Sequence, residues 1–290
     1  MKRGAWRVPR GARCLLVLAA LACAGRTSQT SDAPNASDGF VITGDAEAPR
    51  GATWTFRGTV DGTRYDLAGV LLKPSGPGPF PAVIVSHGSR GSAENIASLV
   101  GPAMVQWGLV VIAPNYTHSE GVPVGSPGDG GEPGASRANV ERAHTTYLLL
   151  RQLGYVDMQR VALHGHSMGA WVSAAVASAW PNDFHVASTT GGGVRPNAIR
   201  RGPAPSESQL RGIRIPFQLH HGSADETLPV AYDERFDALL ASLGVEHELY
   251  VYPGRGHLQV RSDPLLLERI HVWYAKHGMF TPSTAGQDSR

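Results

Sequence analysis

A serine set between glycines is the first group in this sequence with the potential for chemistry. It lies in the run Gly165-His166-Ser167-Met168-Gly169. A short apolar segment, 160–164, precedes the run, and small residues suited to a helix follow it over 170–180. G-x-S-x-G between a strand and a helix is typical of a sharp turn that presents the serine hydroxyl, with glycines where a Cβ has no room. We therefore predict that Ser167 is a catalytic nucleophile.

A serine hydroxyl needs a base to take its proton, and the base needs a carboxylate to orient it. Both residue types follow Ser167 in the chain. Asp225 ends the run 221–225, which leaves a predicted strand, and His257 ends the run 252–257, which leaves the last predicted strand. The sequence thus predicts His257 as the general base and Asp225 as the acid that orients it.

Each of these two assignments has an alternative. Asp225 has the residue type of a helix cap, because a helix is predicted soon after it. His257 would be an ordinary solvated histidine if its loop faced water. Glu226 is the rival acid, and His271 and His277 are rival bases, although both fall in a predicted terminal helix that faces away from the strand ends.

Acyl transfer also needs donors for the negative charge that develops on the carbonyl oxygen. The backbone N–H of Met168 is one candidate, because it follows the nucleophile at a helix N-terminus. The second candidate is the backbone N–H of Ser89, in the loop after the predicted strand 82–86. Tyr116 and Trp171 are candidate substrate-binding residues, with core packing as their alternative role.

These side chains need a scaffold of alternating strands and helices. The first predicted strands, 54–56 and 65–71, flank a turn at Asp61-Gly62. The further predicted strands are 82–86, 110–113, 161–164, 185–189, 217–220 and 247–252. The predicted helices are 93–107, 136–153, 229–243, 263–277 and one that starts at Met168. This order indicates an α/β fold: a mostly parallel central sheet with helices on both faces and an antiparallel N-terminal edge.

Two irregular segments interrupt this order. The segment 121–135 is dense in glycine and proline, and it is either a loose surface loop or a rim of the substrate site. The segment 190–214 is short for a separate lid. We therefore expect one domain, over residues 51–280, with no large lid domain.

The N-terminal residues have the features of an export signal. Five basic residues precede an eleven-residue apolar stretch, 14–24, which is too short to span a membrane. Residues 1–24 are therefore predicted to be a signal peptide. Two processing routes stay open: lipidation of Cys23 after a lipobox-like sequence, or ordinary cleavage before Gly25. The third alternative is that residues 1–24 stay uncleaved and act as an anchor.

The predicted export signal also bears on the segments outside the domain and on where the protein is located. Residues 25–50 are predicted to be a flexible linker and residues 281–290 a disordered tail. We expect a secreted, periplasmic or cell-surface protein, attached to a membrane only if Cys23 is lipidated. Its partner is predicted to be a substrate, and the chain a monomer.

Composition narrows the function classes. The chain has 290 residues, of which 42% are apolar and 17% charged, so it can form a full core. Without the leader, the formal net charge of +2 becomes about −3, which argues against nucleic-acid binding. Both cysteines lie in the leader, so the rest of the chain has neither a disulfide nor a cysteine nucleophile.

A metal site is the competing constellation. Four histidines are predicted near the same sheet edge, and imidazole is a good zinc ligand. They are His164, His166, His220 and His221. The chain has no H-E-x-x-H motif on a helix. These four histidines lie on predicted strands and turns that the predicted hydrolase site already explains. We predict no metal and no cofactor.

Taken together, these motifs resemble the α/β-hydrolase fold, in particular the dienelactone hydrolase-like group. Secreted esterases and the catalytic domains of prolyl-oligopeptidase-type peptidases are similar too. The matching pieces are His87-Gly88, the run 165–169, His221-Gly222-x-x-Asp225 with Pro229, and Gly256-His257. The resemblance implies a Ser-His-Asp triad. Dienelactone hydrolases proper use cysteine where this chain has Ser167, so their substrate is not carried over.

The sequence thus predicts a serine hydrolase that forms an acyl-enzyme and cleaves a small-molecule or polymeric carboxylic ester. A peptidase or amidase of the prolyl-oligopeptidase type is the alternative, because the same residues serve amide hydrolysis. A non-catalytic binding protein on the same fold is the third hypothesis.

Overall fold

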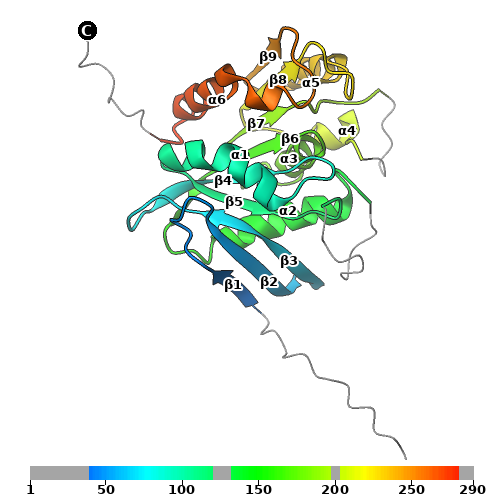
Figure 1. The fold of residues 1–290 in the computed structure, drawn as a ribbon. Coiled ribbons are helices and arrows are strands. Elements are labelled where there is room, and N and C mark those ends of the chain that lie inside the picture. Colours follow the sequence, from blue (N-terminus) through cyan, green and yellow to red (C-terminus); the bar gives the residue numbers. More distant parts are fainter. Residues whose placement is uncertain (1–38, 120–131, 197–202, 281–290) are drawn as a thin grey trace, which may run out of the picture. The chain divides into compact units, whose positions relative to one another are not determined.

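A nine-stranded sheet forms the centre of the computed structural model, which describes residues 39–119, 132–196 and 203–280 (Figure 1). The strand order is β1-β2-β3-β5-β4-β6-β7-β8-β9. The strands are β1 Gly39–Thr43, β2 Ala52–Val60, β3 Thr63–Leu72, β4 Phe80–Ser86, β5 Val110–Pro114, β6 Val156–His166, β7 Val186–Thr190, β8 Phe217–Gly222 and β9 His247–Tyr252. The predicted signal peptide (1–24) and the predicted tail (281–290) lie outside the described residues.

The sheet has two kinds of strand, as the sequence predicts. Strands β4 to β9 pair in parallel, while β1, β2 and β3 form an antiparallel edge. The parallel strands β5, β7 and β8 are buried along their whole length, which is typical of parallel strands covered on both faces. In β2, buried and exposed residues alternate, because one face of this edge meets water.

Helices cover both faces of the sheet (Figure 1). Helices α1 (Ala93–Gln106) and α6 (Pro264–Lys276) pack on one face, against Val83, Val85 and Val111. The other face carries α2 Arg137–Leu150, α3 Met168–Ala179, α4 Glu207–Leu210 and α5 Ala231–Ser242. The mostly parallel α/β-hydrolase architecture expected from the sequence is confirmed.

The connections out of β4 and β6 place a crevice at the centre of the sheet. The chain leaves β4 through α1 on one face, and it leaves the neighbouring β6 through α3 on the other face. Ligands of open α/β sheets bind at such a switch point, beyond the carboxyl ends of the strands. The loop after Ser86 and the turn after His166 meet at this place.

The first strand lies where a flexible linker was predicted (25–50). Residues 39–43 pair with β2 in antiparallel register, and the ring of Phe40 contacts that of Trp54 edge-on at 5.8 Å. The linker prediction is therefore wrong for β1, and the folded part starts before residue 51. Five residues at a sheet edge, with Val41 and Ile42 exposed, have too little apolar periodicity to mark a strand.

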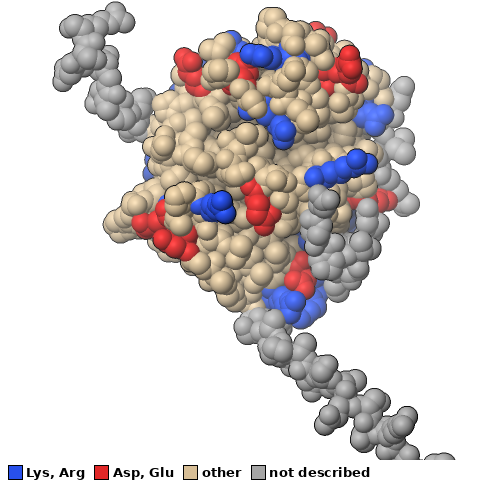
Figure 2. Space-filling model, in the orientation of Figure 1, with Lys and Arg blue, Asp and Glu red and all other residues tan. Residues whose placement is uncertain are grey.

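The surface has no strong separation of charge on the face drawn in Figure 2, where basic and acidic side chains are scattered between uncharged ones. No helix within the described ranges is both long and apolar enough to cross a bilayer.

Candidate active site

Ser167 occupies a strained turn between β6 and α3. Its backbone has φ 55° and ψ −119°, a conformation that non-glycine residues rarely adopt. A Cβ on Gly165 would lie 2.3 Å from the carbonyl oxygen of Gly169, and a Cβ on Gly169 would lie 2.0 Å from that of Ser86. The two glycines are therefore needed for the backbone to turn here, and the turn places Ser167 at the carboxyl end of the sheet, where it lines a cavity.

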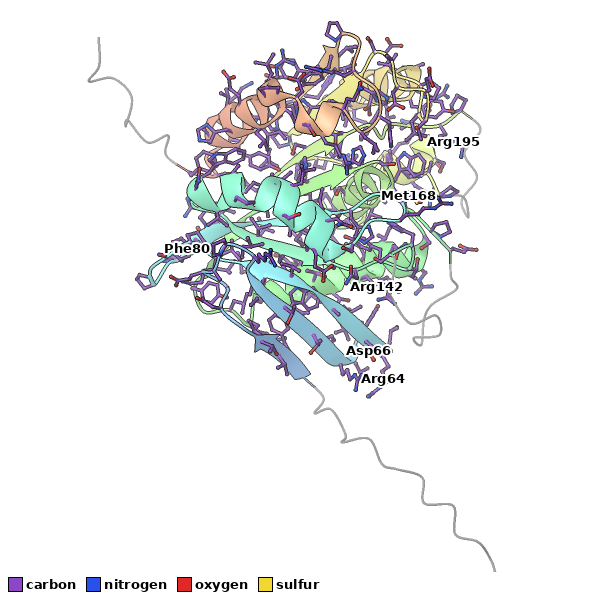
Figure 3. The ribbon with its side chains drawn as sticks, viewed as in Figure 1. Arg64, Asp66, Phe80, Arg142, Met168 and Arg195 are labelled. Atoms are coloured by element: carbon purple, nitrogen blue, oxygen red, sulfur yellow. The ribbon has the colours of Figure 1, made fainter. Side chains whose placement is uncertain are left out.

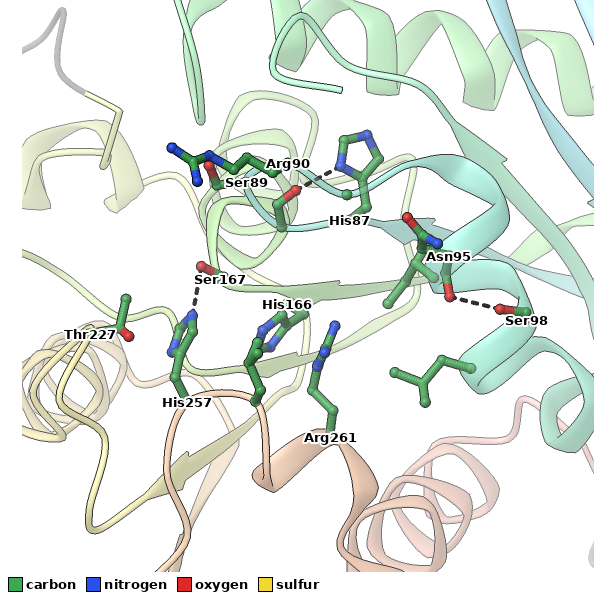
Figure 4. A pocket seen from close by; sticks show the side chains of 15 residues that line it. His87, Ser89, Arg90, Asn95, Ser98, His166, Ser167, Thr227, His257 and Arg261 are labelled. Atoms are coloured by element: carbon green, nitrogen blue, oxygen red, sulfur yellow. Dashed lines mark hydrogen bonds between the residues drawn. The ribbon is translucent and has the colours of Figure 1, made fainter. Parts of the chain in front are cut away.

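The structure brings Ser167, His257 and Asp225 together. The Ser167 Oγ lies 2.9 Å from His257 Nε2, and His257 Nδ1 lies 2.6 Å from Asp225 Oδ2 (Figure 4 shows the first contact). In the direction a hydrolase needs, the hydroxyl donates to Nε2 and Nδ1–H donates to the carboxylate. His257 comes from the loop between β9 and α6, and Asp225 from the loop between β8 and α5.

Asp225 contacts His257 and also bonds within its own loop, but it does not cap a helix, because α5 begins at Ala231 without a side-chain cap. Its Oδ2 faces His257, while its Oδ1 accepts the backbone N–H groups of Thr227 and Leu228, both at 2.8 Å. The side chain is completely buried. These two hydrogen bonds fix the orientation of the Asp225 carboxylate within its own loop. The loop thereby holds Oδ2 facing His257.

The rival residues lie elsewhere. Glu226 is exposed. His271 of α6 contacts the rings of Trp107 and Phe280, and His277 at the end of α6 contacts that of Trp273. None of the three lines the cavity at Ser167.

The loop after β4 passes directly against the nucleophile. A Cβ on Gly88 would lie 3.1 Å from the Cβ of Ser167, so the backbone approaches closely there. Ser89 lines the same cavity as Ser167 and His257. Met168 is the first residue of α3 (Figure 3), and the first N–H groups of a helix have no partner within it. Both predicted amide donors thus belong to the backbone around Ser167.

His87 holds this loop in place. Its Nδ1–H donates to the Gly88 carbonyl at 2.8 Å, and its Nε2 accepts from the Ser119 hydroxyl at 2.7 Å. One ring nitrogen therefore donates and the other accepts, as in a neutral imidazole. Burial lowers the pKa of His87 to about 4, which keeps the ring neutral at pH 7.

A cavity of about 670 Å³ opens in front of Ser167 (Figure 4). Its lining includes Arg90, from the loop after β4, and Arg261, from the 3₁₀ turn η1, Val260–Ser262. None of the described residues that line it is an aspartate or a glutamate. Its remaining lining residues are His87, Gly88, Ser89, Gly91, Asn95, Ile96, Ser98, Leu99, His166, Thr227, His257 and Leu258. The two arginines carried no signal in the sequence that pointed to this place.

Tyr116 and Trp171, the predicted substrate-binding residues, do not line this cavity. Tyr116 is fully buried, and its hydroxyl lies 2.7 Å from Ser86 Oγ. Trp171 is buried against Ala135 and Ala204. Both are packing residues instead, because large aromatic side chains next to a site fill the core beneath it. The loop expected at 121–135 lies mostly outside the described residues.

The four histidines considered as metal ligands each have a different hydrogen-bond partner. One ring nitrogen of each lies within hydrogen-bond distance of another side chain. The pairs are His164 with Ser188, His166 with Thr190, His220 with Tyr252 and His221 with Asp233. Each histidine thus has a role in packing or hydrogen bonding of its own.

Comparison with known proteins gives one family. Residues 67–264 match the model of the dienelactone hydrolase family. A protein of Synechocystis sp. (strain ATCC 27184 / PCC 6803 / Kazusa) named "Putative carboxymethylenebutenolidase" is 26% identical over 208 residues, which cover 69% of this chain and 83% of that protein.

Solved structures share the fold. A thermophilic esterase from Thermogutta terrifontis has a TM-score of 0.58 and 18% identity, over 79% of this chain and 95% of that one. A puromycin-hydrolyzing peptidase from Mycobacterium tuberculosis has a TM-score of 0.60 and 19% identity, over 82% of this chain. This chain covers only 46% of that peptidase.

Proposed function

This chain belongs to the dienelactone hydrolase family, and we propose that it cleaves carboxylic esters through an acyl-enzyme formed on Ser167. The observation that carries the proposal is the continuous path of hydrogen bonds from the Ser167 hydroxyl through His257 to Asp225. It supplies a nucleophile, a base and an orienting carboxylate, each from a different loop at one sheet edge.

In the first half of the reaction, Ser167 Oγ attacks the ester carbonyl carbon while His257 Nε2 takes the hydroxyl proton. The carbonyl oxygen becomes negative and accepts hydrogen bonds from the backbone N–H groups of Met168 and Ser89. When the tetrahedral intermediate collapses, the bond to the alcohol oxygen breaks, and His257 returns the proton to that oxygen. The acyl group stays on Ser167.

In the second half, a water molecule takes the place of the alcohol. His257 accepts a proton from the water, whose oxygen attacks the acyl carbon, and the bond to Ser167 Oγ then breaks. The proton passes from His257 to Ser167, which regenerates the free enzyme and releases the acid. Asp225 keeps the ring oriented and stabilises the imidazolium that forms in both halves.

The charges of the cavity favour an ester that has a negative group of its own. Arg90 and Arg261 both line the cavity in front of Ser167, and no described carboxylate among the lining residues offsets them. A guanidinium binds a carboxylate through charge-assisted hydrogen bonds. We therefore place substrates with a free carboxylate ahead of neutral ones.

The proposal is tested with Ser167→Ala on p-nitrophenyl esters. We expect kcat to fall by about 10³-fold or more, with an unchanged melting temperature, because only the attacking oxygen is lost. Ser98→Ala, an exposed serine that lines the same cavity, is the matched control and should keep wild-type kcat. Near-full activity of the Ser167 variant would refute the proposal.

A further inference from the structure

A second histidine lies close to Oδ2 of Asp225, the same carboxylate oxygen that His257 contacts. His221 is at the end of β8, and its side chain is completely buried. Its Nδ1 lies 2.6 Å from Oδ2 of Asp233, in the first turn of α5. Its Nε2 lies 2.8 Å from the Leu228 carbonyl oxygen and 3.2 Å from Asp225 Oδ2. Neither His221 nor Asp233 lines the cavity at Ser167.

The partners of His221 define its protonation. Within the described part of the chain, both ring nitrogens face acceptors: two carboxylates and one carbonyl. A neutral imidazole has one N–H only and would turn a lone pair toward an acceptor, whereas the imidazolium donates from both nitrogens. Burial alone would lower the pKa of His221, but Asp233, Leu228 and Asp225 together raise it above its ordinary value.

Asp233 fits the same arrangement. Its side chain is completely buried, and it bonds to no cation other than His221 among the described residues. Burial raises the pKa of Asp233, an effect that His221 opposes. A Cβ on Gly193 would lie 2.2 Å from the Tyr232 backbone, so the start of α5 is pressed against the segment after β7. The carboxylate is therefore held at a fixed place behind His221.

The pairing with Asp233 matters for charge as well as for position. An isolated cation beside Asp225 would compete with the His257 imidazolium for the charge of that carboxylate. Because Asp233 balances the charge of His221, the pair as a whole is neutral. The Nε2–H of His221 donates to the Leu228 carbonyl oxygen and lies 3.2 Å from Asp225 Oδ2, while the Leu228 N–H donates to Asp225 Oδ1. Asp225 keeps its negative charge for His257 and gains a second imidazole that fixes its orientation.

We propose that His221 is a positioning residue: protonated and held by Asp233, it orients the Asp225 carboxylate toward His257. This inference rests on the proposed function, in which Asp225 orients the base. It assigns a role to a side chain that touches neither the substrate nor the reacting atoms. Asp225 and Asp233 are the described titratable groups that face His221, from the loop after β8 and from α5.

The first test is His221→Gln, which keeps one hydrogen-bond donor but removes the charge. We expect kcat on p-nitrophenyl esters to fall about 10- to 100-fold, with KM changed less than about twofold, because the cavity is intact. The wild-type kcat should also fall as the pH rises through the raised folded pKa of His221, and this alkaline limb should be absent in the variant. Asp233→Asn is a second variant that should lower kcat in the same way.

The matched control is His247→Gln. His247 also pairs with an aspartate of α5, Asp237 at 3.3 Å, but it lies away from the cavity. It should keep the wild-type kcat and pH profile. If His221→Gln only lowers the melting temperature, with kcat and pH profile as in wild type, the residue is structural and the inference is wrong.

A third measurement needs no substrate and separates this inference from the proposed function. In ¹⁵N-histidine NMR of the wild-type chain, the His221 resonances, identified by their absence in His221→Gln, should show both ring nitrogens protonated at pH 7. A neutral His221 would overturn the inference even if the esterase activity is found. Protonated His221 in a chain without esterase activity would refute the proposed function and the positioning role with it.

Discussion

The side chain of Arg261 bears on which esters the active site prefers. It lies four positions after His257, on the short turn η1, and reaches the cavity beside His166 (Figure 4). Its Nε has no hydrogen-bond partner among the described residues, and burial lowers its pKa. The half-buried side chain also lines the cavity, where a guanidinium binds an acceptor on the substrate through charge-assisted hydrogen bonds.

We therefore expect Arg261→Met to discriminate between two kinds of ester. For substrates with a free carboxylate, kcat/KM should fall about 10- to 100-fold, since hydrogen bonds to charged groups contribute about 1.5–3 kcal/mol. For a neutral ester of equal length, kcat/KM should stay within about threefold. The measurement is kcat/KM for the two esters in wild type and variant, and an equal loss on both would contradict the role of the charge.

At this scale, the sequence predicted some residues and missed others for a physical reason. Ser167, Asp225 and His257 each follow a strand, so the alternation of strands and helices along the chain is enough to assign their loops to one sheet edge. Arg261 follows no strand and depends on the path of a loop. Tyr116 shows the opposite case, because an aromatic residue near a strand end looks the same in sequence whether it lines a cavity or fills the core.

The element that matters most is the turn that joins β6 to α3. Ser167 keeps its unusual backbone because both flanking glycines let neighbouring backbone approach within contact distance. A strained residue persists only where the surrounding structure holds it. Parallel strand β4 supplies that surrounding, since the Ser86 carbonyl lies directly against Gly169.

Gly169→Ala should therefore destabilise the fold strongly. The added Cβ would meet backbone oxygen at 2.0 Å, and a backbone atom can give way only by moving β4 away from α3. We expect a loss of about 3 kcal/mol or more in the free energy of unfolding, at the upper end of overpacking effects. Gly154→Ala is the control, because its Cβ would have nothing within 4 Å. Urea denaturation checks both, and equal stability of the two variants would contradict the tight turn.

The predicted elements succeeded where burial imposes a pattern. Strands β4 and β5 are apolar runs because helices cover both of their faces, and the sequence located them within a few residues. Strand β6 begins at Val156, before the predicted start at 161, because its first residues are partly exposed and polar. The short helix α4 and the turn η1 were not predicted, since three or four residues do not establish a helical period.

Across the whole molecule, buried histidines make the free energy of unfolding depend on pH. Among the described residues, burial lowers the pKa to about 4 for His87, His118 and His164, and well below its ordinary value for His166 and His220. Their stability contribution is present above pH 6.5 and is lost as the pH falls from there toward 4, since only the unfolded chain then binds protons. His221 acts in the opposite direction: its raised pKa stabilises the fold below pH 6.5, and this is lost as the pH rises through its folded pKa.

Acid unfolding should follow from these neutral imidazole rings. Each costs up to about 1.4 kcal/mol per pH unit below 6.5, and a domain is stable by about 5–15 kcal/mol, so we expect cooperative unfolding between about pH 4 and pH 5.5.

His164→Asn removes one such group and retains an amide near Ser188. The slope of unfolding free energy against pH should then be about 1.4 kcal/mol per unit shallower between pH 4.5 and 6. Between pH 7 and 8 the two slopes should agree, because His164 is neutral there in both states. Denaturant titrations across this range measure both slopes, and equal slopes at acid pH would show that His164 takes up its proton without unfolding.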